Sequence, residues 1–241
     1  MTEFKSFFKT VGGNEGNKCH YPTRLDTYGC GCQHDCKYCY AKSLLDFRKM
    51  WNASQPSIVN IQKVHRVITR HLKEGDIVAD DEYLKLMRKD LAHIQVSITC
   101  TDDGFCKFYE KATPPTKRIE AIERLQAEGF DVQVRLSPYV PQFIEQGVLD
   151  MDIINNIRCD KILVEFLRVN TWIRKWFKID YSDYTLKQSG YLHLPLESKI
   201  KYLKLIQNFK ELTVCEDVSK HYDYWVKNVN PNKLDCCNLK R

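Results

Sequence analysis

The chain has 241 residues, of which 43% are apolar and 28% are charged, a balance that suits a folded domain with a sizeable core and excludes a disordered tail. Lys and Arg (37) outnumber Asp and Glu (31), and the resulting net charge of +6 permits a polyanionic partner without requiring one. No apolar run approaches the ~18 residues of a membrane helix, and residues 1–20 lack the apolar centre of a signal peptide, so we expect a cytoplasmic protein rather than a membrane or exported one.

The first ninety residues combine a polar start with several periodic segments. Residues 1–20 are polar and contain glycine, which predicts a flexible N-terminal arm, and residues 21–241 are expected to form a single domain because no linker interrupts them. Apolar residues then recur at helical spacing or alternate as in strands. The elements predicted here are a strand at Arg24–Tyr28, a helix at Ser57–Glu74, a strand at Asp76–Ala79 and a helix at Asp81–Leu91.

From residue 93 onward, strand and helix patterns alternate regularly. Strands are predicted at His93–Thr99, Asp131–Ser137, Lys161–Leu167 and Leu212–Cys215. Helices are predicted at Thr116–Glu128, Met151–Ile157, Leu196–Phe209 and Val218–Val229. The strand Lys161–Leu167 is apolar and bounded by charge, as is typical of a strand that is buried on both faces. This alternation predicts right-handed β-α-β units, a parallel sheet and one α/β domain.

Polar and thiol residues follow several of the predicted strands. In parallel α/β folds the chemistry lies in loops at the carboxyl ends of the strands, so a shared site is expected there. A cysteine-rich segment follows the first predicted strand. The other residues at this end are Cys100, Ser137, Arg168, Asn170, Glu216 and Asp217.

The chain contains eleven cysteines, an odd number that cannot be fully paired within the chain, and the cytosol keeps thiols reduced. Four lie between positions 30 and 39, in the segment YGCGCQHDCKYCYA. Cys32, Cys36 and Cys39 have the spacing C-x3-C-x2-C, which lets a short loop bring three thiolates around one metal centre. Three thiolates can bind three irons of a [4Fe–4S] cube and leave the fourth open to a small molecule with an amine and a carboxylate.

This spacing, the aromatic residue before the last cysteine and the longer string GCGCQHDCKYCYAKSLL resemble the radical S-adenosylmethionine (radical SAM) superfamily, in particular the branch that contains spore photoproduct lyase. The resemblance implies a partial (βα) barrel, a [4Fe–4S] cluster on Cys32, Cys36 and Cys39, and S-adenosylmethionine (SAM) at the open iron. It also implies a lyase-like or related enzyme, in which an electron from a flavodoxin- or ferredoxin-like donor cleaves SAM to a 5′-deoxyadenosyl radical. That radical would abstract hydrogen from a substrate, for which the family suggests a nucleic-acid base in DNA or RNA.

Further residues are assigned by the same resemblance. Tyr38 stands where the family's aromatic residue approaches the adenine of SAM, and Ser97 stands where a strand residue reaches the ribose or carboxylate. Arg135 and Ser137 fall on the strand that would contribute further SAM contacts. Cys100 is the candidate catalytic thiol, because it follows a strand at the expected active end and spore photoproduct lyase has a thiol that donates a hydrogen atom.

The residues alone leave other interpretations of the thiols open. A structural zinc site could be completed by Cys30 or His34, although no second separated pair of ligands appears. An auxiliary cluster or ordinary core packing could account for the cysteines outside the motif. Those considered are Cys30, Cys100, Cys106, Cys215, Cys236 and Cys237.

Two further features bear on function. Glu165 lies inside an apolar strand, where an unpaired carboxylate is costly, so it either faces a polar barrel interior or pairs with a basic residue such as Arg135. The stretch 169–191 interleaves basic and aromatic residues, which suits a nucleic-acid backbone with base stacking, or else an amphipathic segment over the barrel mouth. Its members include Trp172, Arg174, Lys175, Trp176, Lys178, Tyr181, Tyr184 and Lys187.

The chain departs from the family after the second predicted strand. Relatives have a glycine-rich turn there that holds the SAM amino group, whereas Asp76–Ala79 runs directly into acidic residues. Only 15 residues separate Val78 from Ile94, barely above the ~10–12 of a minimal crossover, so we expect a barrel that is shortened near Val78–Ala79. Two other functions therefore stay open: a nucleic-acid-binding protein with a structural iron–sulfur or zinc site, and an inactive shortened radical SAM homologue.

Overall fold

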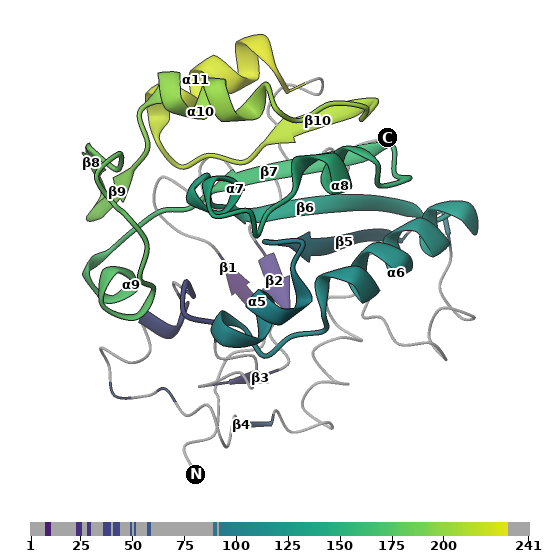
Figure 1. Cartoon of the computed structure of the whole chain (residues 1–241), viewed down its shortest axis with the longest axis horizontal. Coiled ribbons are helices and arrows are strands. Elements are labelled where there is room, and N and C mark those ends of the chain that lie inside the picture. The colour runs from purple at the N-terminus through teal and green to yellow at the C-terminus, as the bar shows by residue number, and fades with distance from the viewer. Residues whose placement is uncertain are drawn as a thin grey trace.

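Four parallel strands form the central sheet of the computed structural model, which describes residues 8–10, 23–25, 28–29, 36–39, 41–43, 49, 51, 57–58, 89–90 and 92–230 (Figure 1). The strands are β5 (His93–Ile98), β6 (Asp131–Tyr139), β7 (Lys161–Phe166) and β10 (Glu211–Val214). Their order across the sheet is β10-β7-β6-β5, and every pairing is parallel. The sequence predicts all four strands to within a few residues, so the α/β class with a parallel sheet is confirmed.

Strand β6 alternates between an apolar and a polar face. Its buried apolar side chains include Val132, Val134 and Leu136. The opposite face of the same strand carries Gln133 and Arg135, because successive strand side chains point to opposite sides. Helix α6 (Pro115–Ala127) packs against β5 and β6. It is followed by Gly129, whose φ of +83° is a left-handed conformation that suits glycine after a helix.

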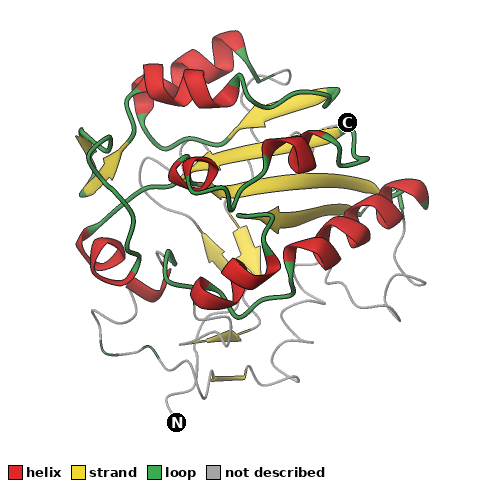
Figure 2. Ribbon diagram, in the orientation of Figure 1, coloured by secondary structure: helices red, strands yellow, loops and turns green. Residues whose placement is uncertain are grey.

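Further helices and a hairpin surround the sheet (Figure 2). They are α5 (Asp103–Tyr109), α7 (Gln142–Glu145), α8 (Met151–Asn155), α9 (Thr171–Trp176), α10 (Leu196–Leu203), α11 (Ser219–Asn228) and the strands β8 (Leu186–Gln188) and β9 (Tyr191–His193). The sequence predicts α6, α8, α10 and α11, but not the hairpin or the short helices α5, α7 and α9, which follow β5, β6 and β7. In the described part of the chain, no helix is both long enough and apolar enough to span a membrane.

Helix α10 ends at Leu203, earlier than the predicted end at Phe209. The side chain of Asn155 on α8 forms two hydrogen bonds with the main chain that follows Leu203. Its Nδ2 donates to the carbonyl of Leu205 (2.9 Å), and its Oδ1 accepts from the backbone amide of Gln207 (2.8 Å). These side-chain bonds replace the helical ones, a competition that hydrophobic periodicity cannot reveal.

Four short strands near the N-terminus form two antiparallel pairs. Strand β1 (Phe8–Thr10) pairs with β2 (Thr23–Leu25), and β3 (Tyr28–Gly29) pairs with β4 (Ser57–Ile58). Two predictions are corrected here. The strand expected at residues 24–28 is split between two strands outside the parallel sheet, and the helix expected from residue 57 does not begin there. Pairs of two or three residues leave too short a pattern to detect.

Other predictions for this part of the chain lie outside the described residues. They are the remainder of the helix to Glu74, the strand Asp76–Ala79 and the expected shortening near Val78–Ala79. Of the helix expected at Asp81–Leu91, the structure describes residues 89–90, which form a turn. The prediction of a helix is therefore wrong for these two residues.

Candidate active site

The cysteine segment docks at the carboxyl-terminal end of the sheet, toward which the strand arrows of Figure 1 point. The backbone amide of Lys37 donates to the carbonyl of Tyr109, the last residue of α5 (3.0 Å). Asn170 Nδ2 donates to Ser43 Oγ (2.9 Å). Because Tyr109 lies in the segment after β5 and Asn170 in the segment after β7, the cysteine segment lies where the sequence predicts a shared site.

Two of the three motif cysteines belong to the described residues. Cys36 and Cys39 are half-buried, and the residues Cys36–Cys39 are referred to below as the cysteine loop. The backbone amide of Lys42 donates to Cys39 Sγ (3.4 Å), and hydrogen bonds to the sulfurs are one means by which proteins tune iron–sulfur clusters. The thiols present therefore fit an iron–sulfur cluster, and by the same donor chemistry zinc. The third motif cysteine, Cys32, lies outside the described residues, as do the alternative zinc ligands Cys30 and His34.

Tyr38, within the cysteine loop, is held by aromatic packing and by one carboxylate. Its ring centroid lies 5.6 Å from that of Tyr109 and 6.0 Å from that of Phe177. Its hydroxyl donates to Glu110. Burial, together with the neighbouring Cys36 and Glu110, raises the pKa of Tyr38 far above its usual value, so the hydroxyl remains protonated. Its place beside an adenine stays a prediction.

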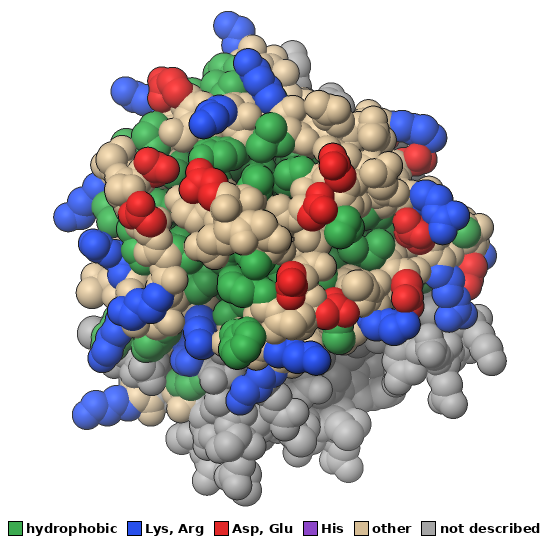
Figure 3. Space-filling view, in the orientation of Figure 1, with side chains coloured by type: hydrophobic (Ala, Val, Ile, Leu, Met, Phe, Trp, Pro, Cys, Tyr) green, Lys and Arg blue, Asp and Glu red, His purple; other side chains and the backbone are tan. Residues whose placement is uncertain are grey.

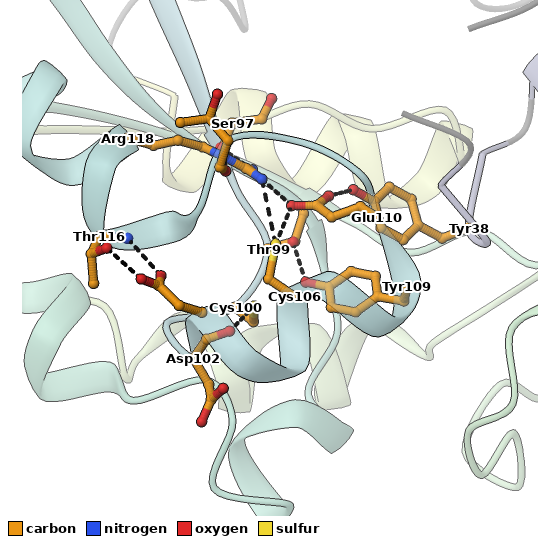
Figure 4. A network of polar contacts seen from close by, with 12 residues as sticks. Tyr38, Ser97, Thr99, Cys100, Asp102, Cys106, Tyr109, Glu110, Thr116 and Arg118 are labelled. Carbon is orange, nitrogen blue, oxygen red and sulfur yellow. Dashed lines mark hydrogen bonds and ion pairs between the residues drawn. The ribbon is translucent and has the colours of Figure 1, made fainter. Parts of the chain in front are cut away.

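Glu110 is the centre of a buried polar network (Figure 4). The residue is 3% exposed, and its carboxylate pairs with the Arg118 guanidinium, accepts from Tyr38 and accepts from the thiol of Cys106 (3.1 Å). Arg118 also donates through Nη1 to the carbonyl of Ser97 on β5 (3.0 Å). A buried carboxylate is costly unless its charge is paired, and this one is paired by Arg118 and accepts hydrogen bonds from Tyr38 and Cys106.

Cys100, the predicted hydrogen-atom donor, is fully buried beside α5. Its thiol donates to the carbonyl of Asp102 (3.4 Å), and burial raises its pKa, so the thiol stays protonated at neutral pH. The hydroxyl of Tyr109 bonds Thr99 Oγ1 (2.5 Å) and also interacts with the Cys100 thiol. Because the ring of Tyr109 packs against Tyr38, Cys100 and Tyr38 contact the same aromatic side chain.

The other predicted site residues share the polar face of the sheet. The register places Ser97 opposite Arg135, and Ser137 lies two residues farther along the same strand. Arg135 Nη2 pairs with Glu165 Oε2 (2.6 Å), and Ser137 Oγ donates to the same oxygen (2.8 Å). Ser97, Arg135 and Ser137 are therefore brought together, whereas Cys100 lies beyond the strand against α5.

Glu165 satisfies both alternatives that the sequence leaves open, since it lies on the polar face and pairs with Arg135. Burial alone would raise its pKa, but Arg135 and Arg168 together lower it, so the carboxylate is ionised. Two fully buried atoms of the same face, Gln133 Nε2 and Thr213 Oγ1, have no hydrogen-bond partner among the described residues. Buried polar atoms are normally bonded to protein, water or ligand, so these two atoms have the capacity for a further hydrogen bond.

A second group of ionisable side chains lies beyond the end of β10. His193, Glu216 and Asp217 offer atoms within 4.8 Å of one another, a spacing that could suit a metal ion. However, Lys199 Nζ lies 2.5 Å from Glu216 Oε2, and the amides of Asp217 and Val218 both donate to Oε1 at 3.1 Å. A metal ion would have to displace the ammonium group, so we interpret this group as a buried ion-pair network.

Sequence reasoning missed Glu110 and Arg118. Neither residue belongs to a motif or a predicted strand. The residues between them include Pro114, so the two do not lie on one continuous predicted helix and their pairing does not follow from spacing. The usable signal is the stretch after the strand HIQVSIT, where Phe105 and Tyr109 stand four residues apart as on one face of a helix. A buried face on such a helix places the carboxylate that follows it close to the interior.

Comparison with known proteins finds similarity at the level of the fold. No protein-family model and no curated protein matches the sequence. Among solved structures, a tyrosine-to-phenylalanine variant of spore photoproduct lyase matches with a TM-score of 0.52 and 11% identity, over 88% of this chain and 80% of that one. Spore photoproduct lyase complexed with dinucleoside spore photoproduct gives a TM-score of 0.47 and 12% identity, over 87% and 75% of the two chains. The first match supports the expected partial radical SAM-type fold.

Proposed function

We propose that the chain is a radical SAM enzyme that binds a [4Fe–4S] cluster through Cys32, Cys36 and Cys39. The observation that carries this proposal is the docking of the cysteine loop at the end of a sheet whose polar face presents the Arg135–Glu165 pair. Thiols that could bind a metal centre and a charged pair on the polar face therefore belong to a parallel sheet whose carboxyl-terminal end is the place where α/β proteins carry their active sites.

Held by the three motif cysteines, the cluster would supply one electron, taken from an external flavodoxin- or ferredoxin-like donor, for the reductive cleavage of SAM to methionine and a 5′-deoxyadenosyl radical. That radical would take a hydrogen atom from the substrate. The chain's own residues bind and orient SAM. The Arg135 guanidinium is suited to the SAM carboxylate, and the hydroxyls of Ser97 and Ser137 are suited to the carboxylate or ribose. Glu165 fixes the guanidinium. Cys100, a buried and protonated thiol, is the candidate hydrogen-atom donor to the substrate radical.

A basic and aromatic surface on α9 supports a nucleic-acid base as the substrate. The rings of Trp172 and Trp176 lie 5.8 Å apart. Lys42 Nζ lies 4.8 Å from the Trp176 ring, and Lys175 Nζ lies 5.8 Å from the Trp172 ring. On the face drawn in Figure 3, Lys and Arg side chains gather at the lower left, where α9 lies. Ammonium groups attract phosphates, and indole rings stack on bases. Helix α9 begins directly after Asn170, whose side chain bonds Ser43, so this surface lies close to the cysteine segment.

The deciding experiment is the EPR spectrum of the reduced, anaerobically reconstituted protein with and without SAM, combined with an assay for 5′-deoxyadenosine. We expect a [4Fe–4S]⁺ signal that changes when SAM is added, and a product that requires both SAM and reductant. A signal indifferent to SAM, with no product, would overturn the enzyme proposal. Salt-dependent nucleic-acid binding would then favour a binding protein with a structural metal, and its absence would favour an inactive shortened homologue.

A further inference from the structure

We infer that Glu110 and Arg118 are positioning residues that fix the cysteine loop through the hydroxyl of Tyr38. The inference rests on the proposed function, because the loop would carry the cluster. It adds to the site two charged residues that lie outside the cysteine motif and outside the strands that face SAM.

A continuous set of polar contacts runs from the sheet to the loop. Arg118 donates to the carbonyl of Ser97 on β5 (3.0 Å) and to the carbonyl of Thr113. Its guanidinium pairs with Oε1 of Glu110, and the hydroxyl of Tyr38 donates to Oε2 of the same carboxylate. Because each carboxylate oxygen is engaged by a different partner, Glu110 has one defined orientation and transmits it to the loop.

Burial makes this link rigid. The side chains of Glu110 and Arg118 are only 2% and 11% exposed, so neither can turn to solvent without leaving its partner unpaired in the interior. The Arg124–Glu128 pair, also at α6, is 68% and 41% exposed and is expected to contribute little. Arg118 therefore ties the loop to β5, whose Ser97 we assign to the SAM-binding face. The link fixes the cysteine thiols relative to that face.

Variants that break the link at either end test the inference. They are Tyr38→Phe, Glu110→Gln and the double variant, with Glu128→Gln as the matched control on the exposed pair. The first readout is the alkylation rate of Cys36 and Cys39 in the metal-free full chain, resolved by peptide mass spectrometry. We expect each single variant to raise the rate about tenfold or more, because it removes a hydrogen bond to a buried charged group. The double variant should match Tyr38→Phe, since both changes break one link.

The second readout is the reconstituted protein. Both single variants should shift the midpoint potential of the cluster and alter the SAM-induced EPR change, while Glu128→Gln should behave as wild type. Rates and potentials equal to wild type, or effects that add in the double variant, would overturn the inference. If Glu110→Gln does not fold, Tyr38→Phe alone tests the inference, because it removes the hydrogen bond without changing any charge. A wild-type cluster that ignores SAM overturns the proposed function instead, while the alkylation rates still decide whether the link exists.

Discussion

Lys199 of α10 and Glu216, which follows β10, form an ion pair that is almost completely buried. Lys199 Nζ lies 2.5 Å from Glu216 Oε2, and the two side chains are 2% and 3% exposed. The indole of Trp225 on α11 donates to the same oxygen at 3.3 Å. The carboxylate therefore joins the end of the outermost described strand of the parallel sheet to the two helices that flank it, and its charge is compensated inside the core.

Removal of the lysine charge should destabilise the fold. Lys199→Met leaves the Glu216 carboxylate buried without its cation, and breaking a buried pair in this way typically costs about 3–5 kcal/mol. We expect a loss of that size in the free energy of unfolding, measured by urea titration. Lys201→Met, an exposed position on the same helix, serves as the control and should change stability by less than about 0.5 kcal/mol. A loss at Lys199 no larger than the control's would contradict the assignment of a buried pair.

Asp131 should make the stability depend on pH in the acid range. The hydrogen bond from His93 Nδ1 (2.9 Å), assisted by Lys161 Nζ (2.9 Å), lowers the pKa of Asp131 well below its usual value. A group with a lowered pKa stabilises the fold above its unfolded-state pKa of about 3.9, and the contribution is lost as the pH falls below that value. Asp131→Asn should therefore destabilise the protein at neutral pH and much less in strong acid. Urea titrations across this pH range measure the free energy of unfolding of each variant, with the exposed Asp152→Asn as control. An equal loss of stability at every pH would refute the role assigned to the Asp131 carboxylate.

The regular half of the fold could be predicted because its strands are long enough for burial to shape the pattern. The segment Ile162–Val164 is buried on both faces, so it reads as a short apolar run. Helices α5 and α9 could not be predicted in this way, because seven and six residues do not establish a helical period. Both helices are instead defined by their N-caps, since Asp102 and Asn170 each accept from the amide three residues on (2.6 and 2.9 Å).

The candidate site divides along the same line. The cysteine motif can be recognised from the sequence because its spacing is local. Ser97, Arg135 and Ser137 are assigned by the family resemblance, and strand alternation explains why they share one face of the sheet. The buried pairing of Glu110 is a tertiary contact. The helical spacing of Phe105 and Tyr109 can place the carboxylate near the interior, but it does not identify Arg118 as the partner. The pairing becomes visible only when α5, α6 and the cysteine segment are assembled.

Arg135 should control the affinity for SAM. In Arg135→Met the guanidinium is lost and Glu165 is left without its ion-pair partner at 2.6 Å, so a negative charge would face the SAM carboxylate. We expect SAM binding to weaken about tenfold or more, because hydrogen bonds to charged groups are among the stronger ones. Anaerobic equilibrium dialysis of the reconstituted protein measures the Kd. Arg124→Met, on the exposed side of α6, should leave it unchanged, and an unchanged Kd for Arg135→Met would exclude the assigned role.

The α9 surface should bind nucleic acid through its lysines. Neutralising Lys175 and Lys178 to Met removes two exposed charges, of which Lys175 lies over the Trp172 ring and Lys178 donates to the carbonyl of Arg174. If both contact phosphates, the slope of log K against log salt should become less steep by about 1.4–1.8, the lower value for single strands. Fluorescence anisotropy with labelled oligonucleotides at several salt concentrations measures this slope. A matched double variant at Lys201 and Lys204, two exposed lysines on α10 and at its C-terminal end, should keep the wild-type slope. Equal slopes for both double variants would rule out the α9 surface.

Cys36 should be required for the metal centre, whatever the metal proves to be. Its thiol is half-buried in the loop held by Tyr109 and Tyr38, and a centre with three thiolate ligands that loses one leaves a second metal position without protein support. Cys36→Ala should therefore abolish the [4Fe–4S]⁺ signal and most of the bound iron and sulfide after reconstitution. Cys215→Ala, half-buried at the end of β10, is the control and should retain both. If Cys36→Ala keeps the iron and Cys215→Ala loses it, the cluster lies outside the motif. If the wild-type protein takes up zinc but no iron and sulfide, and Cys36→Ala loses that zinc, the motif is a zinc site.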